Sequence, residues 1–248
     1  MISVCLASHN GALYLAEQIA SILEQLSLAD ELIIVDDCST DNTLDVIQAF
    51  DDERIQIYGN TSQLGHVKSF AKAIARAKGD IVFLSDQDDI WPPGRVKTMV
   101  NAMNTQGVAV IAANFHRIDK AGQTLAAPSV QLRSADSTKY LTNILGIFLG
   151  RRPYYGCTMA FRGHFRDQLL PIPGFVESHD LWIALAANLE SEIHHLEDSV
   201  LQKRTHANNV SSRQRRALPI VFISRLRLLA SVVILLWRAW QPKKDNGK

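Results

Sequence analysis

The sequence predicts an α/β protein with one mostly parallel sheet flanked by helices, and with an apolar helical tail at its C-terminal end. Short apolar runs alternate with stretches of helical spacing through residue 86, and parallel strands need crossovers of this length between them. The chain has 248 residues, of which 47% are hydrophobic and 21% charged, so it can bury a large core. We expect one domain over 1–212, in two halves, 1–105 and 106–212, followed by the tail over 213–248.

The first half of the chain supplies the clearest elements. Residues 2–8 form an apolar run, and apolar side chains recur at helical spacing over 12–26. By the same reasoning we expect strands at 31–37, 54–60 and 79–86, and helices at 43–50 and 69–77. Ser39 or Thr40 is expected to cap the helix at 43–50 through its hydroxyl group.

The second half of the chain has a weaker pattern. Residues 108–118 fit another strand, and residues 140–149 have helical spacing. A further helix is expected over 178–189, with Ser178 as its cap. Residues 191–206 combine features of strand and loop.

Charge and cysteine content exclude several classes of function. The 26 basic and 25 acidic residues give a formal net charge of +1, so no overall field favours nucleic acid as a partner. Cys5, Cys38 and Cys157 are odd in number and lack the CxxC spacing of a zinc or redox site, which indicates buried thiols in a reducing compartment. Because no basic-then-apolar leader precedes Ile2, we expect a cytoplasmic protein.

Acidic residues gather where two of the expected strands end. Asp36 and Asp37 close the second strand, and Asp86, Asp88 and Asp89 follow the fourth in the run SDQDD. The carboxyl ends of parallel strands share one edge of a sheet, where ligands bind. Carboxylates this close need a proton or a cation to neutralise them, and Asp86 with Asp88 suits Mg²⁺ or Mn²⁺ with phosphate oxygens as further ligands. The alternative is a solvated turn in which an aspartate caps the next helix, and Asp89 fits either a cap or a support for a metal ligand.

The first half resembles a known family through three segments in order: SVCLASHNGALYLAEQIASIL, ELIIVDDCSTDNT and QLGHVKSFAKAIARAKGDIVFLSDQDDIWPPGRV. Together they look like the nucleotide-sugar-binding half of the family 2 glycosyltransferases, whose GT-A fold has a Rossmann-like sheet. The resemblance implies that Asp37, with Asp36 nearby, contacts the nucleobase, and that Asp88 is the principal metal ligand of a DxD motif. The other donor-site residues that it implies are Ala7, His9, Asn10, Lys68, Asp86 and Gln87, with Asp86 also a metal ligand.

The same resemblance places residues of the second half around the acceptor. FVESHDLWIALAA resembles the family's acidic segment at a helix start, which implies that Asp180 is the general base, ahead of Glu177. QKRTHANNVSS resembles a basic loop over the donor, which implies that His206 contacts the metal or the diphosphate and that Arg204 pairs with phosphate oxygens. The expected acceptor site consists of Tyr155, Gly156, Glu177, His179 and Trp182.

These assignments have plainer alternatives. Asp180 also suits an acid in the first turn of a helix, where the helix dipole favours it. His206 also suits a solvated loop histidine. For Tyr155 and Trp182 the alternative is packing in the hydrophobic core.

The tail is strongly apolar from residue 218 to residue 240, but Arg225, Arg227 and Arg238 interrupt it. Its longest uninterrupted apolar run is about ten residues, short of the roughly 20 that span a bilayer. Together with the basic residues on either side, this pattern predicts a helix at the surface of an anionic membrane. The alternative is a helix in the core or in a dimer interface.

The residues and the resemblance together predict an inverting, metal-dependent glycosyltransferase. Its expected substrates are a nucleoside-diphosphate sugar and a growing, lipid-linked bacterial polysaccharide or O-antigen at the inner face of the cell membrane. DQDDIW is similar to members that transfer rhamnose. A catalytically degenerate scaffold of the same fold is the alternative, although the intact acids argue against it. A receiver domain would carry its acidic pair after the first strand, and ASHNGALY lacks the glycine-rich motif of nucleotidyltransferases and dehydrogenases.

Overall fold

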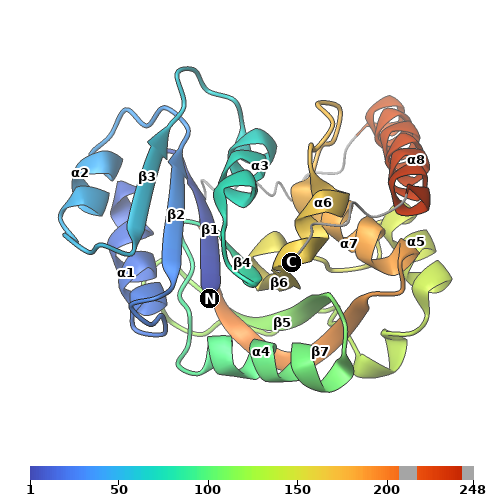
Figure 1. Cartoon of the computed structure of the whole chain (residues 1–248), viewed down its shortest axis with the longest axis horizontal. Helices are drawn as coiled ribbons and strands as arrows, with labels where there is room; N and C mark the ends of the chain where they lie inside the picture. Colours follow the sequence, from blue (N-terminus) through green and yellow to red (C-terminus); the bar gives the residue numbers. More distant parts are fainter. Residues whose placement is uncertain (207–216, 242–248) are drawn as a thin grey trace.

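The computed structural model describes residues 1–206 and 217–241, and in this part of the chain a seven-stranded sheet forms the centre of the molecule (Figure 1). The strands lie in the order β3-β2-β1-β4-β6-β5-β7. Their bounds are β1 (Ile2–Ser8), β2 (Glu31–Asp36), β3 (Ile55–Gly59), β4 (Ile81–Ser85), β5 (Val110–Ile118), β6 (Met159–Arg162) and β7 (Ile193–Arg204). Only β6 runs antiparallel to its neighbours, β4 and β5, among these strands. The mostly parallel sheet that the sequence predicts is therefore confirmed.

Helices cover both faces of this sheet. Their bounds are α1 (Ala12–Leu23), α2 (Thr43–Gln48), α3 (His66–Arg76), α4 (Arg95–Gln106), α5 (Tyr140–Phe148), α6 (Arg166–Leu169), α7 (His179–Leu189) and α8 (Leu218–Trp240). The side chains of α3, α5 and α7 pack in one hydrophobic core, and those of α1, α2 and α4 pack in the other. The inner strands between them are covered on both faces.

The strand β2 shows why the apolar runs are continuous. Ile33 and Val35 belong to the core on the α3 side, whereas Leu32 and Ile34 belong to the core on the α1 side. Successive side chains of a strand point to opposite faces, so a strand buried on both faces must be apolar at every position. The continuous run therefore identifies an inner strand of the sheet.

Two local predictions are wrong. Neither Ser39 nor Thr40 caps α2: the helix begins at Thr43 after Asn42, whose side chain makes no capping bond, and the Ser39 hydroxyl donates to Asp36 instead. Residues 193–204 form one long strand rather than a mixture of strand and loop, because β7 pairs with β5 along its whole length across register shifts. The cap predicted at Ser178 is confirmed, since its hydroxyl oxygen accepts from Leu181 N at 3.3 Å.

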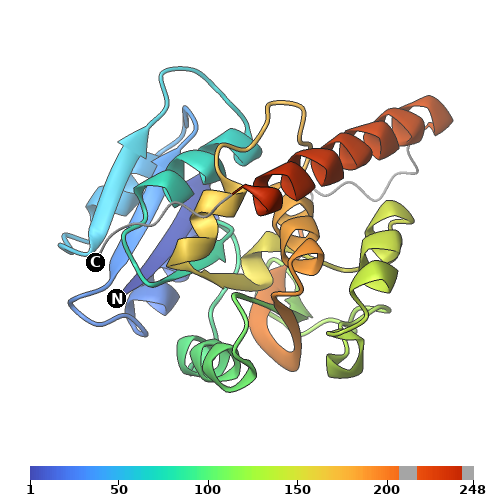
Figure 2. The same ribbon diagram turned by 45° about the vertical axis from the view of Figure 1, so that its right-hand side comes forward.

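The helix predicted in the tail is present as α8, which lies along the edge of the molecule beside α6 and α7 (Figure 2). Ser224, Ser231 and Leu235 are buried on its inner side. Among the described residues, α8 is long and apolar enough to cross a membrane by length and composition, with a mean hydropathy of 2.1 in its most apolar window and 17% of that window buried. The proposed domain boundary at 212/213 lies outside the described residues.

Candidate active site

Three loops meet at the carboxyl edge of the sheet. Ser8 at the end of β1 is level with Asp36 at the end of β2, and Leu6 of β1 is level with Ser85 at the end of β4. The loops that follow these strands begin at His9, Asp37 and Asp86. The parallel register thus brings together the three loops that begin at His9, Asp37 and Asp86.

Gln87 fastens the loop after β4 to the loop after β1. Its Oε1 accepts from His9 N at 2.8 Å, and its Nε2 donates to His9 O at 3.0 Å. His9 Nδ1 lies 2.8 Å from Asp37 O. Asn10 Oδ1 accepts from Thr40 N at 2.7 Å, which ties the first loop to the second. His9, Asn10 and Gln87 are therefore adjacent, and Ala7 is half-buried at the end of β1 beneath them.

The acids that end β2 are engaged in holding the backbone. Asp37 accepts from Leu64 N, Gly65 N and Asn60 Nδ2, each at 2.7 Å. Although burial opposes it, these donors hold the pKa of Asp37 below its ordinary value. Asp36 accepts from Ser8 Oγ at 3.1 Å and from Ser39 N at 2.9 Å. Both carboxylates thus shape the nucleotide loops, and base contact by Asp37 stays a prediction.

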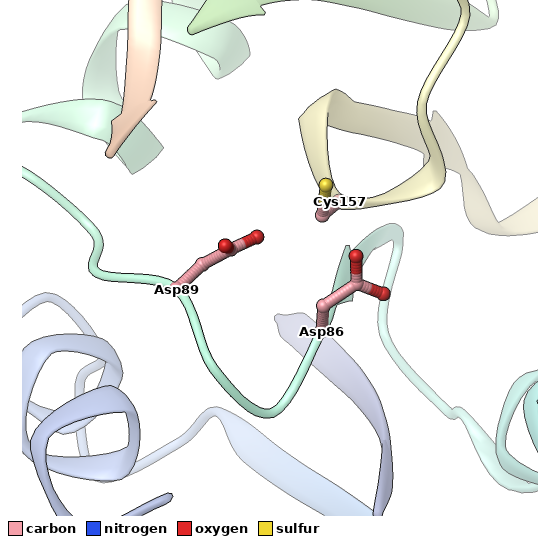
Figure 3. A group of neighbouring side chains, drawn as sticks. All are labelled: Asp86, Asp89 and Cys157. Carbon is pink, nitrogen blue, oxygen red and sulfur yellow. The ribbon is translucent and has the colours of Figure 1, made fainter. Parts of the chain in front are cut away.

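The three aspartates after β4 point in different directions. The Asp86 side chain is 34% exposed, whereas that of Asp89 is 0% exposed and lies deeper (Figure 3). Asp89 Oδ1 accepts from Arg204 N at 2.9 Å. Asp88 Oδ2 lies 2.8 Å from Nε2 of His206. The turn therefore places each of its three carboxylates against a group at or just after the end of β7.

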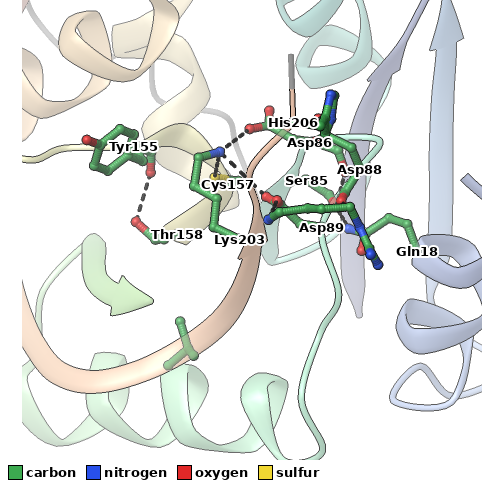
Figure 4. Close-up of polar contacts among 12 residues, drawn as sticks. Gln18, Ser85, Asp86, Asp88, Asp89, Tyr155, Cys157, Thr158, Lys203 and His206 are labelled. Atoms are coloured by element: carbon green, nitrogen blue, oxygen red, sulfur yellow. Dashed lines mark hydrogen bonds and ion pairs between the residues drawn. The ribbon is translucent and has the colours of Figure 1, made fainter. Parts of the chain in front are cut away.

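Lys203 is the cation of this acidic group, and the sequence analysis did not identify it. Its Nζ lies 3.2 Å from Asp86 Oδ2 and 3.4 Å from Cys157 Sγ, as Figure 4 shows, and 3.7 Å from Asp89 Oδ2. It lies directly before Arg204 and three positions before His206, within the basic run QKRTH, but nothing local to that run distinguishes its role. Its partners are distant in the chain: Asp86 lies 117 residues away and Cys157 lies 46 residues away.

The charges in this group shift one another's pKa values. Burial raises the pKa of Asp89 to about 7, and Lys203 only partly offsets it. Burial and the neighbouring Asp86 raise the pKa of Asp88. In spite of burial, Lys203 holds the pKa of Asp86 below its ordinary value, while Asp89, Cys157 and Asp86 raise that of Lys203. Lys203 and Asp86 are therefore an ion pair at neutral pH.

Asp88 and His206, two of the predicted metal ligands, lie within hydrogen-bond distance of each other. Two ligands at right angles around an ion, each about 2.1 Å from it, lie about 3 Å apart. The 2.8 Å between Asp88 Oδ2 and His206 Nε2 fits that separation. A carboxylate with an imidazole suits Mn²⁺ better than Mg²⁺, which prefers oxygen. Of the predicted ligands, Asp88 and His206 thus lie together, whereas Asp86 lies against an ammonium group.

Arg204 does not face a phosphate site. Arg204 is only 3% exposed. Its guanidinium donates to the backbone oxygens of Asp88 and Lys120, both at 3.1 Å, and pairs with the carboxylate of Glu17. It also lies over the ring of Tyr14 at 4.7 Å. The predicted pairing with phosphate is therefore corrected: Arg204 connects β7, the acidic turn and α1. Residues 207–212 of the predicted basic loop lie outside the described residues.

The acceptor candidates sit at the start of α7 and in the segment before β6. Asp180 is half-buried in the first turn of α7 and accepts from Leu181 N at 2.8 Å. The buried His179 ring stacks on Phe70 at 4.0 Å, and neither of its ring nitrogens has a hydrogen-bond partner among the described residues. A Cβ on Gly156 would lie 2.5 Å from His179 Nε2, so this close approach requires glycine. Tyr155 is half-buried, edge-on to Phe115.

Three other predicted residues lie elsewhere. Trp182 is 1% exposed and donates from Nε1 to Leu169 O at 3.0 Å, so it packs in the core and offers no ring face to an acceptor. Glu177 pairs with Arg227 of α8 and accepts from Ser224 Oγ at 2.8 Å. Lys68 and Glu177 line a cavity of about 240 Å³ between the start of α3 and residues 172–177. Lys68 thus lies at this cavity, near the segment that precedes α7.

Comparison with known proteins agrees with this arrangement. The description "Glycosyl transferase family 2" matches residues 3–167, which include all three loops at the sheet edge. The chain belongs to glycosyl transferase family 2. The full-length likeness to TarS of S. aureus, crystallised in complex with UDP, has a TM-score of 0.67 at 17% identity and covers 99% of this chain and 73% of that one. This family 2 protein therefore has the predicted GT-A fold.

Curated relatives of this family 2 protein match about half of its length. The putative teichuronic acid biosynthesis glycosyltransferase TuaG of Bacillus subtilis is 32% identical over 127 residues, which is 50% of each chain. The UDP-Glc:alpha-D-GlcNAc-diphosphoundecaprenol beta-1,3-glucosyltransferase WfgD of Escherichia coli is 27% identical over 119 residues, 48% of this chain and 47% of that one. The chain thus spans half or less of the length of these relatives.

Proposed function

We propose that the protein is an inverting, metal-dependent glycosyltransferase of bacterial surface polysaccharide synthesis, which moves one sugar from a nucleoside-diphosphate donor to a growing glycan. The observation that carries the proposal is the meeting of Asp88 and His206, 2.8 Å apart, beside Asp86 at the carboxyl edge of the sheet. These residues come from distant parts of a family 2 chain. A diphosphate bound there would have its negative charge next to two side chains that can bind a divalent cation.

In this proposal each half of the chain has its own task. His9, Asn10 and Gln87 shape the loops that hold the nucleotide, and Asp88 with His206 would hold Mn²⁺ or Mg²⁺, which offsets the charge of the departing diphosphate. Asp180 accepts the proton of the attacking acceptor hydroxyl. The acceptor oxygen forms the new bond at the anomeric carbon as the bond to the diphosphate breaks on the opposite side, so the configuration inverts. Tyr155 and Gly156 stand on the acceptor side.

We also propose that the acceptor is linked to a lipid and that the protein works at the inner face of the cell membrane. Two observations support this step. WfgD, by its name, acts on a sugar carried by diphosphoundecaprenol, and α8 exposes a long apolar face. We propose rhamnose as the sugar because DQDDIW is similar to members that transfer it. We propose no nucleic acid as a partner.

A panel of UDP-, dTDP- and GDP-sugars tests the donor assignment. With Mn²⁺ or Mg²⁺ present, the correct donor is expected to raise the thermal midpoint, since at 100 times its Kd a ligand adds about 2.7 kcal/mol of stability. The same donor with a metal chelator should stabilise less. If no donor stabilises the protein with either metal, the donor site is wrongly assigned, and a scaffold role becomes the better account.

Asp180→Asn tests the base. The amide cannot accept the proton, so we expect transfer to fall by about 10²- to 10⁴-fold while the donor still raises the thermal midpoint. Glu177→Gln serves as the matched control, because Glu177 pairs with α8 and should change transfer far less. Near-normal transfer by Asp180→Asn would mean that another group takes the proton.

A further inference from the structure

The acidic turn and Cys157 together form a group of ligand atoms that resembles a metal site. One ligand atom each of Asp86, Asp89 and Cys157 lies within 4.8 Å of the other two (Figure 3). Carboxylates and thiolates at such distances commonly hold a cation such as Zn²⁺ or Mn²⁺. In this chain, however, Lys203 Nζ lies against all three: at 3.2 Å from Asp86, 3.7 Å from Asp89 and 3.4 Å from Cys157 (Figure 4).

The backbone on either side of Lys203 fixes its place. Gln202 and Ile90 exchange two backbone hydrogen bonds of 3.0 Å, and Arg204 N donates to Asp89 at 2.9 Å. The residues before and after Lys203 are thus both bonded to the acidic turn. An ammonium group held in this way is already in position, so no side chain has to move before it can act on the acidic turn.

The burial of Asp89 shows that the cation is needed. Its side chain is 0% exposed, and its Oδ2 has no hydrogen-bond partner among the described residues. The Lys203 ammonium at 3.7 Å is the group that faces this oxygen in the described structure. A buried carboxylate without a compensating charge is strongly destabilising.

We propose that Lys203 is the permanent cation of the Asp86–Asp89–Cys157 group and that it thereby restricts divalent-ion binding to Asp88 and His206, one ion per chain. Lys203 is a positioning residue in this proposal. The role given to the Asp88–His206 site rests on the proposed function. Lys203 holds Asp86 in an ion pair at 3.2 Å. It also keeps soft metals off Cys157, a thiol that would otherwise bind them in preference to the catalytic ion.

Metal titration of Lys203→Met tests the proposal. Methionine has a similar length and no charge, so the three ligand atoms are left without a cation. We expect the wild-type protein to bind one Mn²⁺ and to show no thiolate-to-metal absorption with Cd²⁺, which reports a metal–sulfur bond. Lys203→Met should bind a second ion and gain that absorption band, and Lys203→Met combined with Cys157→Ser should lose the band again.

Two controls separate charge from general damage. Lys203→Arg keeps the positive charge and should bind like the wild type, and Lys97→Met removes an exposed lysine of α4 and should also change nothing. The proposal is overturned if Lys203→Met binds metals as the wild type does, or if the wild type itself shows the Cd²⁺ band. If the wild type binds no ion, the metal part of the proposed function fails, and a second-site band in Lys203→Met still supports the role of Lys203.

A further variant covers the case in which Lys203→Met folds poorly. Adding Asp89→Asn removes the buried acid that Lys203 neutralises, so the double variant should have a higher urea midpoint than Lys203→Met alone. Failure of Asp89→Asn to restore any stability would mean that Lys203 does not act as its counter-charge, and would overturn the proposal.

Discussion

At the scale of single residues, His195 in β7 links the stability of the protein to pH. It is fully buried, and its ring nitrogens lie 2.8 Å from Tyr154 Oη and 3.2 Å from Arg133 O. Burial lowers the pKa of His195 to about 4, from an ordinary value of 6.5. Between these pH values the unfolded chain binds a proton that the folded protein does not, so the free energy of unfolding falls as the pH is lowered through this window.

We therefore predict that His195 lowers the free energy of unfolding by about 2 kcal/mol between pH 7.5 and pH 5. Urea denaturation at the two pH values measures the change. His195→Gln cannot titrate, so it should be less stable at both values but should show a pH dependence smaller by that amount. The exposed His116→Gln is the matched control and should keep the full dependence. An unchanged dependence in His195→Gln would assign the effect to another group.

The same scale shows which site residues a sequence can identify. Asp86 and Asp88 were singled out by their type and spacing, and His206 by the family resemblance, and their roles stay predictions. Lys203 was missed because its partners, Asp86 and Cys157, lie far away in the chain. Arg204 and Trp182 were assigned to substrates because burial of a polar or aromatic side chain is decided by tertiary packing, which the local pattern does not contain.

At the scale of elements, α8 has two unlike faces. Arg227 pairs with Glu177, and Arg238 donates to Gln168 O and to Pro171 O. These arginines therefore face the body of the protein. The exposed large apolar residues of α8 include Leu226, Leu229, Val233, Leu236, Trp237 and Trp240.

This orientation gives a prediction about membranes. Trp237 and Trp240 are 60% and 90% exposed, and tryptophans favour the boundary between lipid and water. Replacing both by glutamate should abolish sedimentation with anionic liposomes and leave the thermal midpoint nearly unchanged. Leu28→Glu, at an exposed leucine of the body, is the control and should sediment like the wild type. Loss of a dimer in ultracentrifugation, with liposome binding unchanged, would instead make this face a subunit interface.

The strands β1, β2 and β4 of the first half were predictable because they are buried on both faces, whereas β3 is not buried and was predictable from its alternating pattern. The helix α4 was not predicted, since only Arg95, Met99 and Met103 of it are buried and its apolar pattern is sparse. The strand β7 was underestimated for another reason: His194, Asp198 and Lys203 interrupt its apolar pattern, and its extended form depends on pairing with β5. Pairing between distant segments is not visible in a local window.

At the scale of the whole molecule, the tail and the proposed base are joined through one short segment. Glu177, which α8 holds through Arg227 and Ser224, comes three residues before Asp180, and Pro171 accepts from Arg238. The loops assigned to the donor instead hold one another through Gln87, Asp36 and Asp37. A change at α8 therefore reaches the acceptor side without passing through the donor site.

This connection predicts that Arg227→Ala slows transfer but leaves donor affinity unchanged. The Arg227–Glu177 pair is partly exposed and so contributes about 0.2–1 kcal/mol, which corresponds to a loss of up to about fivefold in kcat. Arg225→Ala, which removes the same charge from the same helix, should have less effect, and the exchange of Arg227→Glu with Glu177→Arg should restore the rate. Steady-state kinetics with donor titration separates the change in kcat from the change in donor affinity. An equal loss in donor affinity would show that α8 acts on both halves of the site, and the independence of the donor loops would have to be abandoned.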